Sequence, residues 1–141
     1  MLSLLLAASV LATTPAPTVD TDAKPVTAAY YYKVRWGFQQ EFERLFFANH
    51  YPLLKAQTGG RIKSVEVFKP TYHGDGRADW TFLVVITYAN WAAFEGVPGA
   101  EEDLTKKLFP DQEKYKKEEQ RRFEILDAHW DVPLSPVSPP Q

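Results

Sequence analysis

The segment Trp80–Tyr88 has the sequence WTFLVVITY and is the most hydrophobic of the strands that the sequence predicts. A short run that is apolar at most positions is typical of a strand in the middle of a sheet, buried on both faces. The loop Thr71–Asp79 precedes it and contains glycines and aspartates, which favour turns. We predict that this loop joins the central strand to an earlier strand at Arg61–Pro70.

The chain before these two strands predicts a strand followed by a helix. Residues Thr27–Trp36 alternate between two faces, as in a strand. Gly37 ends that strand, and Phe38–Lys55 then has apolar residues at helical spacing. Pro52 lacks an N–H group, so we expect it to kink this helix or to end it around Tyr51. The more apolar face of the strand, which should contact the helices, consists of Ala28, Tyr30, Tyr32, Val34 and Trp36.

The chain after the central strand predicts short helical segments, a longer helix and a last strand. Asn90–Phe94 begins with a residue that favours a helix N-cap, and Pro98–Leu108 is one or two helical turns. Asp111 is the expected N-cap of a helix that reaches Leu126. The short last strand is expected at Asp127–Val132.

The longer helix is rich in charged residues. Arg121 and Arg122 have glutamates three or four positions away, so we expect both to form salt bridges on the surface. In the last strand, His129 alternates with Trp130 and should face away from the surface on which Trp130 packs. If His129 lies on a dimer face, we interpret it as a hydrogen-bonded interface histidine. The expected inner face of the helix consists of Tyr115, Phe123 and Leu126.

The order strand, helix, strand, strand, helix, strand predicts an α+β fold of the ferredoxin-like βαββαβ type. Its four-stranded antiparallel sheet has helices on one face. The other face is apolar here, and a soluble monomer rarely exposes a contiguous apolar surface. We therefore predict that two copies pair their sheets across a twofold axis, so that the partner of the chain is itself.

The chain resembles the dimeric α/β-barrel superfamily from about Ala28 to Val132. The resemblance rests on the element order, on the aromatic first strand that ends in RWGF, and on the helix-rich segment before a short last strand. The chain is also similar to a bacterial subset, to which no reaction is assigned, that has NHYPLL at Asn49–Leu54 and EEQRRFEILDAHW at Glu118–Trp130. The resemblance implies a barrel built from two protomers and a ligand pocket between sheet and helices.

The same superfamily includes several functional classes. These are cofactor-free monooxygenases that act on aromatic polyketides, polyketide cyclases, haem-degrading enzymes, dye-type peroxidases, muconolactone isomerases, and binding or regulatory modules. A shared fold does not choose among them.

The N-terminus predicts the location of the protein. Leu2–Ala12 is almost entirely Leu, Ala, Val and Ser, a length that suits the apolar region of a signal peptide and is too short to span a bilayer. With a signal peptide the protein would be secreted or periplasmic, and without one it would be cytoplasmic. We expect a signal peptide at 1–12, a flexible leader at 13–26, the ferredoxin-like domain at 27–132 and a Pro-rich tail at 133–141.

Composition excludes several classes of function. The chain has no cysteine, which removes disulfides, thiol nucleophiles and cysteine-based metal sites. The formal net charge of -2 gives no general attraction for nucleic acid. Nothing in the mature chain is long and apolar enough to span a membrane. The three histidines have no metal-ligand spacing, and we expect neither a metal nor another cofactor.

Two histidine–tyrosine pairs are the candidate catalytic groups. These are His50 with Tyr51 at the end of the first helix, and Tyr72 with His73 in the Gly/Asp loop. Histidine titrates near neutral pH, and a tyrosine hydroxyl can donate to a developing oxyanion. The structural alternatives, which we favour, are a capping role for His50 and a turn-stabilising or solvated role for the loop pair.

Aromatic residues are the candidate ligand contacts, because a planar apolar molecule can stack on them. A well-filled core is the alternative that we favour. The primary hypothesis is an exported homodimer that binds a small apolar or aromatic molecule. The alternatives are a cofactor-independent monooxygenase or polyketide-cyclase-like enzyme with His/Tyr acid–base chemistry, and a non-catalytic interaction module. The candidate ligand contacts are Tyr32, Trp36, Phe46, Trp80 and Trp130.

Overall fold

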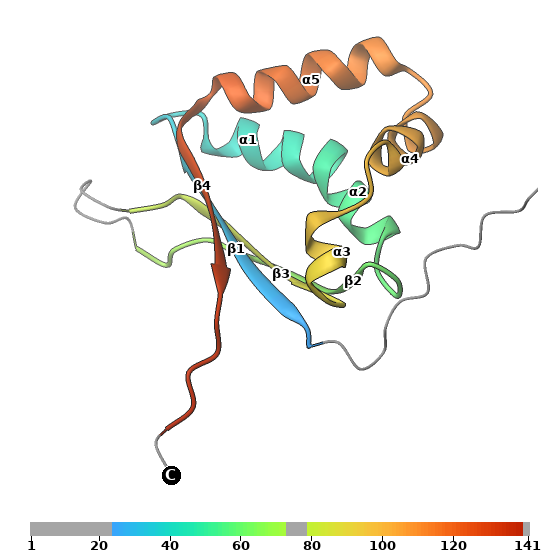
Figure 1. Cartoon of the computed structure of the whole chain (residues 1–141). Helices are drawn as coiled ribbons and strands as arrows, with labels where there is room; N and C mark the ends of the chain where they lie inside the picture. The colour runs from blue at the N-terminus through green and yellow to red at the C-terminus, as the bar shows by residue number, and fades with distance from the viewer. Residues whose placement is uncertain (1–23, 73–78, 140–141) are drawn as a thin grey trace, which may run out of the picture.

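The fold is a single antiparallel sheet with helices on one face (Figure 1). The structure is a computed structural model that describes residues 24–72 and 79–139. The strands are β1 (Val26–Val34), β2 (Ile62–Phe68), β3 (Phe82–Tyr88) and β4 (Leu126–Leu134), in the order β2-β3-β1-β4. The helices are α1 (Gln39–Leu45), the π-helix η1 (Phe46–His50), α2 (Tyr51–Ala56), α3 (Trp91–Glu95), α4 (Ala100–Leu108) and α5 (Gln112–Glu124).

The predicted βαββαβ order and the central position of β3 are confirmed. All three strand pairs are antiparallel, and β1 and β3 form the middle of the sheet. The alternation predicted for β1 is also confirmed, because Ala28, Tyr32 and Val34 are buried under the helices. Trp36 is the exception. The strand ends at Val34, and the Trp36 side chain is 80% exposed in the turn that follows.

The first helix does not end at Tyr51, so that part of the prediction is wrong. Instead the chain forms a π-helical turn, η1, and continues as α2 (Figure 1). The Tyr51 N–H donates to the carbonyl of Phe46, five residues earlier, which is the hydrogen bond of a π-helix and not of an α-helix. Pro52 lies in the first turn of α2, where a missing N–H is best tolerated. The proline is thus accommodated by a local change of helix type.

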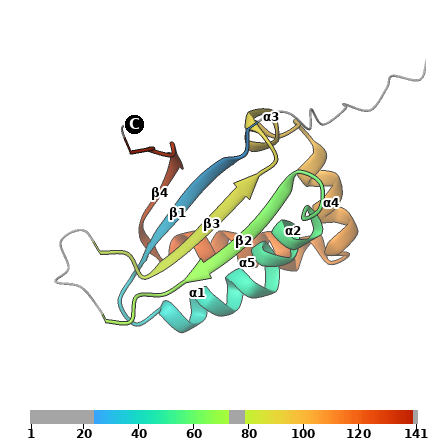
Figure 2. The same cartoon turned by 90° about the horizontal axis from the view of Figure 1, so that it is seen from below.

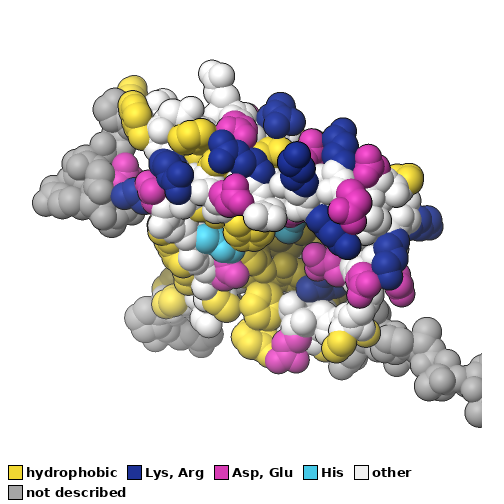
Figure 3. All heavy atoms as spheres, turned by 90° about the horizontal axis from the view of Figure 1, so that it is seen from above, with side chains coloured by type: hydrophobic (Ala, Val, Ile, Leu, Met, Phe, Trp, Pro, Cys, Tyr) yellow, Lys and Arg dark blue, Asp and Glu magenta, His cyan; other side chains and the backbone are white. Residues whose placement is uncertain are grey.

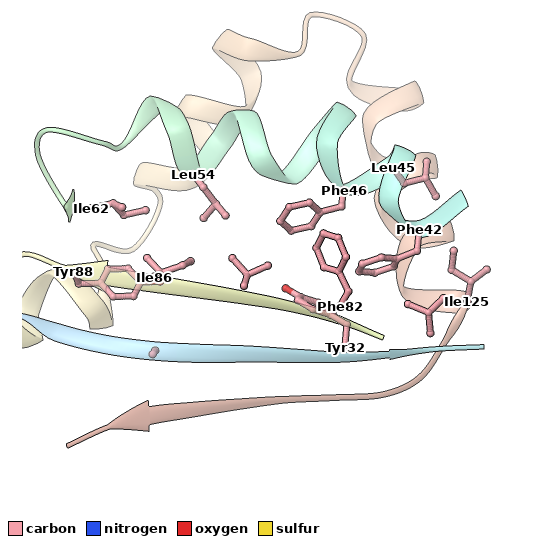
Figure 4. Close-up of a cluster of buried hydrophobic side chains, with 13 residues drawn as sticks. Tyr32, Phe42, Leu45, Phe46, Leu54, Ile62, Phe82, Ile86, Tyr88 and Ile125 are labelled. Carbon is pink, nitrogen blue, oxygen red and sulfur yellow. The ribbon is translucent and has the colours of Figure 1, made fainter. Parts of the chain in front are cut away.

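Aromatic rings fill the space between β1, β3 and the first helix (Figure 4). The Phe46 ring lies 4.8 Å from the Phe82 ring and 6.3 Å from the Tyr32 ring, and Phe42 lies 5.2 Å from Tyr32. Ring pairs at these separations add attraction to the effect of burial. This end of the layer between sheet and helices is therefore filled core.

The edge strand β2 has an irregularity that the sequence pattern missed. Its register against β3 shifts between Ile62 and Ser64. Such a bulge changes the side on which the following residues lie. Ile62 is fully buried, and both Val65 and Val67 also pack against the core, whereas Ser64 is exposed.

The other edge strand, β4, continues two residues past the predicted end at Val132. Pro133 pairs with Ala28, and Leu134 pairs with Thr27. Proline is tolerated on an edge strand because its missing N–H can lie on the side without a partner strand. The start of the Pro-rich tail therefore belongs to the sheet.

One face of the sheet has no helix on it in the described part of the chain (Figure 2). Tyr31 of β1 stacks on Trp130 of β4 with ring centroids 5.3 Å apart, and Trp80 meets Tyr31 edge-on. Phe68, Val132 and Leu134 are exposed at its edges. We call this surface the open face. The exposed Ser64 and Glu66 of β2 also lie on it. By strand alternation its apolar residues are Tyr31, Phe68, Leu83, Val85, Trp130, Val132 and Leu134.

No helix among residues 24–72 and 79–139 is long and apolar enough to cross a membrane. The expected signal peptide lies outside the described residues.

Candidate functional site

A cavity of about 250 Å³ lies between the sheet and the helices. Figure 3 shows the helix side of the molecule, which is hollowed, with hydrophobic side chains in the hollow and histidine at its edge. The sheet supplies one wall and α2, α3 and α4 supply the other. The lining residues are Tyr30, Tyr32, His50, Leu53, Leu54, Gln57, Arg61, Val84, Ile86, Tyr88, Phe94 and Glu101.

His50 is the last residue of η1 and reaches this cavity. Burial lowers its pKa to about 3, and the nearby Arg122 and His129 act in the same direction. The imidazole is therefore neutral at physiological pH, with one nitrogen that donates and one that accepts. Its ring lies 5.5 Å from that of Phe46.

Three tyrosines face the same cavity from two strands. The hydroxyls of Tyr30 on β1 and Tyr88 on β3 are 2.7 Å apart and share a hydrogen bond. Burial raises the pKa of both, and that of Tyr32 to about 12. All three hydroxyls therefore keep their protons at neutral pH and can donate hydrogen bonds.

Arg61 closes one end of the cavity. Its guanidinium donates to the carbonyls of Ala93 and Phe94 and to Oε1 of Gln57, and it lies over the ring of Tyr88. These bonds fasten the C-terminal end of α3 to the end of α2. Each of the three guanidinium nitrogens of Arg61 donates one hydrogen bond, so this arginine holds the wall of the cavity in place.

Arg122 is buried, which corrects the expectation of a surface salt bridge. Its side chain is 1% exposed and forms two bonds to Glu119, at 2.9 and 2.7 Å. Arg121 does pair on the surface, with Glu41. Phe123, expected inside, is 52% exposed. The inner stripe of α5 instead includes Arg122 and leads to the fully buried Ile125.

His129 lies on the helix side of β4, opposite to Trp130. Its ring stacks on Tyr32 at 4.3 Å, and its Nε2 lies 3.1 Å from Oδ1 of Asp131. Burial lowers the pKa of His129, while the Asp131 carboxylate raises it. His129 is therefore not on the open face, and the interpretation as a dimer-interface histidine does not apply.

The predicted catalytic residues do not converge as pairs. His50 lines the cavity, whereas Tyr51 packs against Phe47 and Phe46 beside it. Tyr72 is 84% exposed, and His73 lies outside the described residues. The tyrosines that accompany His50 come from the sheet.

The predicted ligand contacts are divided between three places. Tyr32 lines the cavity and Phe46 lies in the core beside it. Trp80 and Trp130 are grouped around Tyr31 on the open face, and Trp36 is in an exposed turn. The expectation that all five surround one interior pocket is wrong, because three of them lie outside the helix-covered layer.

Several residues in or near the cavity were missed by sequence reasoning. Tyr30 and Tyr88 could have been found, since strand alternation places them on the helix face of β1 and β3. Arg122 could have been found from its offset of seven positions from Tyr115, which is two helical turns. Arg61 gave no signal, because its role depends on where α3 ends. Within the described ranges, no three His, Asp or Glu side chains gather in a metal-binding group.

Comparison with known proteins gives matches of structure alone. No family model and no curated protein matches the chain. A DABB family protein from Mesorhizobium loti matches with a TM-score of 0.52 and 12% identity, over 81% of this chain and 98% of that chain. SnoaB, a cofactor-independent oxygenase from Streptomyces nogalater, matches with a TM-score of 0.51 and 15% identity, over 83% and 97%.

A dimeric ferredoxin-like protein from Thermobifida fusca matches with a TM-score of 0.50 and 10% identity, over 84% of this chain and 96% of that chain. The chain has the ferredoxin-like fold. The architecture implied by the resemblance to dimeric α/β-barrel proteins is thus confirmed at the level of the protomer.

Proposed function

We propose that the protein is a homodimer in which each protomer binds a small apolar or aromatic molecule between sheet and helices. The observation that supports this most is the cavity itself, with apolar walls from Leu53, Val84 and Ile86 and a few polar groups. Apolar walls with a small number of fixed polar groups are typical of ligand sites.

The size of the cavity limits the ligand. Its volume of about 250 Å³ lies just below the ~300–1,000 Å³ of typical ligand sites. A molecule with a single ring suits this space, whereas a polycyclic one would require the helices to move.

The homodimer is supported by the open face. A largely apolar surface with stacked aromatic rings and exposed Phe68 and Leu134 is costly in water. A second copy placed across a twofold axis would cover it. The cavity lies on the opposite side of the sheet, so pairing through the open face leaves each cavity accessible.

An acid–base enzyme is the second candidate, of the cofactor-independent monooxygenase or cyclase kind. It is favoured by the convergence of His50 with tyrosines from other segments on one cavity. Binding ranks first because a histidine whose pKa is about 3 is a weak base at neutral pH. The interaction-module hypothesis predicted a protein without a cavity, and the cavity counts against it.

The binding proposal is tested by titrating the purified protein with 4-methylphenol and benzamide in a calorimeter. We expect millimolar or tighter binding at one site per protomer. Ile86→Phe, which adds volume inside the cavity, should weaken both ligands by about tenfold or more. Val85→Ile is the matched control, because Val85 is the preceding residue and lies on the open face. It should leave both affinities unchanged. A wild-type protein that binds neither compound would contradict the proposal.

A further inference from the structure

The two arginines near the cavity differ in how their donors are used. Arg61 is partly exposed and donates to two carbonyls and a side-chain amide. Arg122 is 1% exposed and uses Nε and Nη2 on Glu119, while its buried Nη1 has no hydrogen-bond partner among the described residues. A buried donor on a charged group without a partner is costly and rare.

The surroundings of Arg122 connect it to the cavity. Its charge acts on the pKa values of Tyr32, His50 and His129, after the larger effect of burial on each of them. Tyr32 and His50 both line the cavity. Contacts place the guanidinium near the cavity, although Arg122 itself is not among the lining residues. Tyr32 stacks on His129 at 4.3 Å, His129 meets the Phe123 ring edge-on, and the Arg122 guanidinium lies 4.5 Å over that ring.

We propose that the ligand carries an anionic oxygen, a carboxylate in the first instance, which binds where Nη1 of Arg122 meets the Tyr32 hydroxyl and His50. This inference rests on the proposed function and adds the chemical class of the ligand: a single-ring aromatic acid.

The groups at this end suit an anion better than a neutral oxygen. A buried tyrosine hydroxyl, a neutral imidazole and an arginine N–H can each donate, and a hydrogen bond between charged partners is roughly twice as strong as a neutral one. Two of the three acidic residues nearby have basic partners. Glu119 is bonded to Arg122, and Asp131 lies 3.1 Å from His129. The third, Glu101 of α4, lines the cavity together with Arg61.

The test compares benzoate with benzamide, which has nearly the same shape and no charge, on the full-length protein at constant ionic strength. We expect benzoate to bind at least about tenfold more tightly. The variant Arg122→Met with Glu119→Gln removes the charge pair together, because removal of one partner alone leaves a buried charge. In this double variant, benzoate should bind no more tightly than benzamide, while the affinity for benzamide stays within about threefold of the wild-type value.

Tyr32→Phe gives a second measurement that keeps the charge pair intact. It removes one donor, so it should weaken benzoate more than benzamide, and circular dichroism verifies the fold of both variants. Equal affinity of the wild type for the two compounds would overturn this inference and leave the proposed function standing. Preference for benzoate that persists in both variants would also overturn it. Binding of neither compound would overturn the proposed function as well.

Discussion

The two faces of the sheet differ in what covers them. On the helix face, Val84 and Ile86 are buried by side chains of the same chain, and a cavity remains beside them. On the open face, Val85 and Leu83 are only half-buried. The exposed residue that pairs with Leu83 is Phe68, and the one that pairs with Val85 is Glu66. The first face is covered by the chain's own helices, while the second is the face that the proposed second copy would cover. Adjacent residues of β3 therefore serve two different purposes.

The largest expected effect is that of Val84→Asp. Val84 is 1% exposed in the core, and a lone buried carboxylate costs several kcal/mol, comparable to the ~5–15 kcal/mol that stabilises a typical domain. We expect the variant to be unfolded or to lose most of its stability in urea denaturation. Val84→Ala is the control, with a smaller loss. A cooperative transition close to that of the wild type would mean that this face is not the core.

Val85→Asp, one position further on, should separate the dimer and leave the protomer folded. Val85 pairs with Ala29 across the open face, where a carboxylate would be buried only by the second copy. Sedimentation velocity at micromolar concentration measures this, with Val85→Thr as the nearly isosteric control. A wild type that sediments as a monomer, or a Val85→Asp variant that stays dimeric, would refute pairing through this face.

The same comparison explains which parts of the structure could be predicted from sequence. The pairing of β1 with β3 is regular through Tyr32, so alternation with a period of two predicted the face of Tyr32 correctly. The prediction that Arg122 lies on the surface was wrong. Its spacing from Tyr115 places it on the inner side of α5, but an arginine with a neighbouring glutamate is typical of an exposed position. Of the two alternatives predicted for Pro52, an end of the helix at Tyr51 is wrong. The π-turn found there depends on packing beyond the local sequence. The cavity arises from the ends of several elements, which no single pattern encodes.

The pH dependence of stability should come mainly from the helix face. Burial lowers the pKa of His50 to about 3 and also lowers that of His129, whereas both should titrate near 6.5 when unfolded. Below pH 6.5 the histidines bind protons in the unfolded chain but stay neutral in the folded chain, where their pKa values are lower. For His50, stability is therefore fully present above this pH and falls as the pH drops toward 3, by up to about 1.4 kcal/mol per pH unit. The lowered pKa of His129 acts in the same direction.

Urea denaturation between pH 7.5 and 4.5 measures this slope. His50→Gln removes one titrating group and should flatten the slope over this range, while His129→Gln, the comparison variant, should flatten it less because Asp131 opposes the shift of His129. An unchanged slope in His50→Gln would show that the imidazole is accessible to water in the folded protein.

The smallest effect concerns the turn that ends α3 above the cavity. Gly96 has φ 78° and ψ 178°, a backbone conformation essentially restricted to glycine. A Cβ there would lie 3.0 Å from Nη2 of Arg61, the side chain that fastens α3. Gly96→Ala should therefore cost about 1–3 kcal/mol in urea denaturation. It should also weaken binding in the cavity, because Arg61 forms its wall.

Gly59→Ala is the matched control, because Gly59 also has positive φ, at 86°, but a Cβ there meets nothing within 4 Å. Gly59→Ala should lower stability only through backbone strain, by about 1–2 kcal/mol, and leave ligand affinity unchanged. If both variants lose equal stability and neither affects binding, then Arg61 does not hold the cavity wall. The helix face would in that case owe its shape to the apolar core alone.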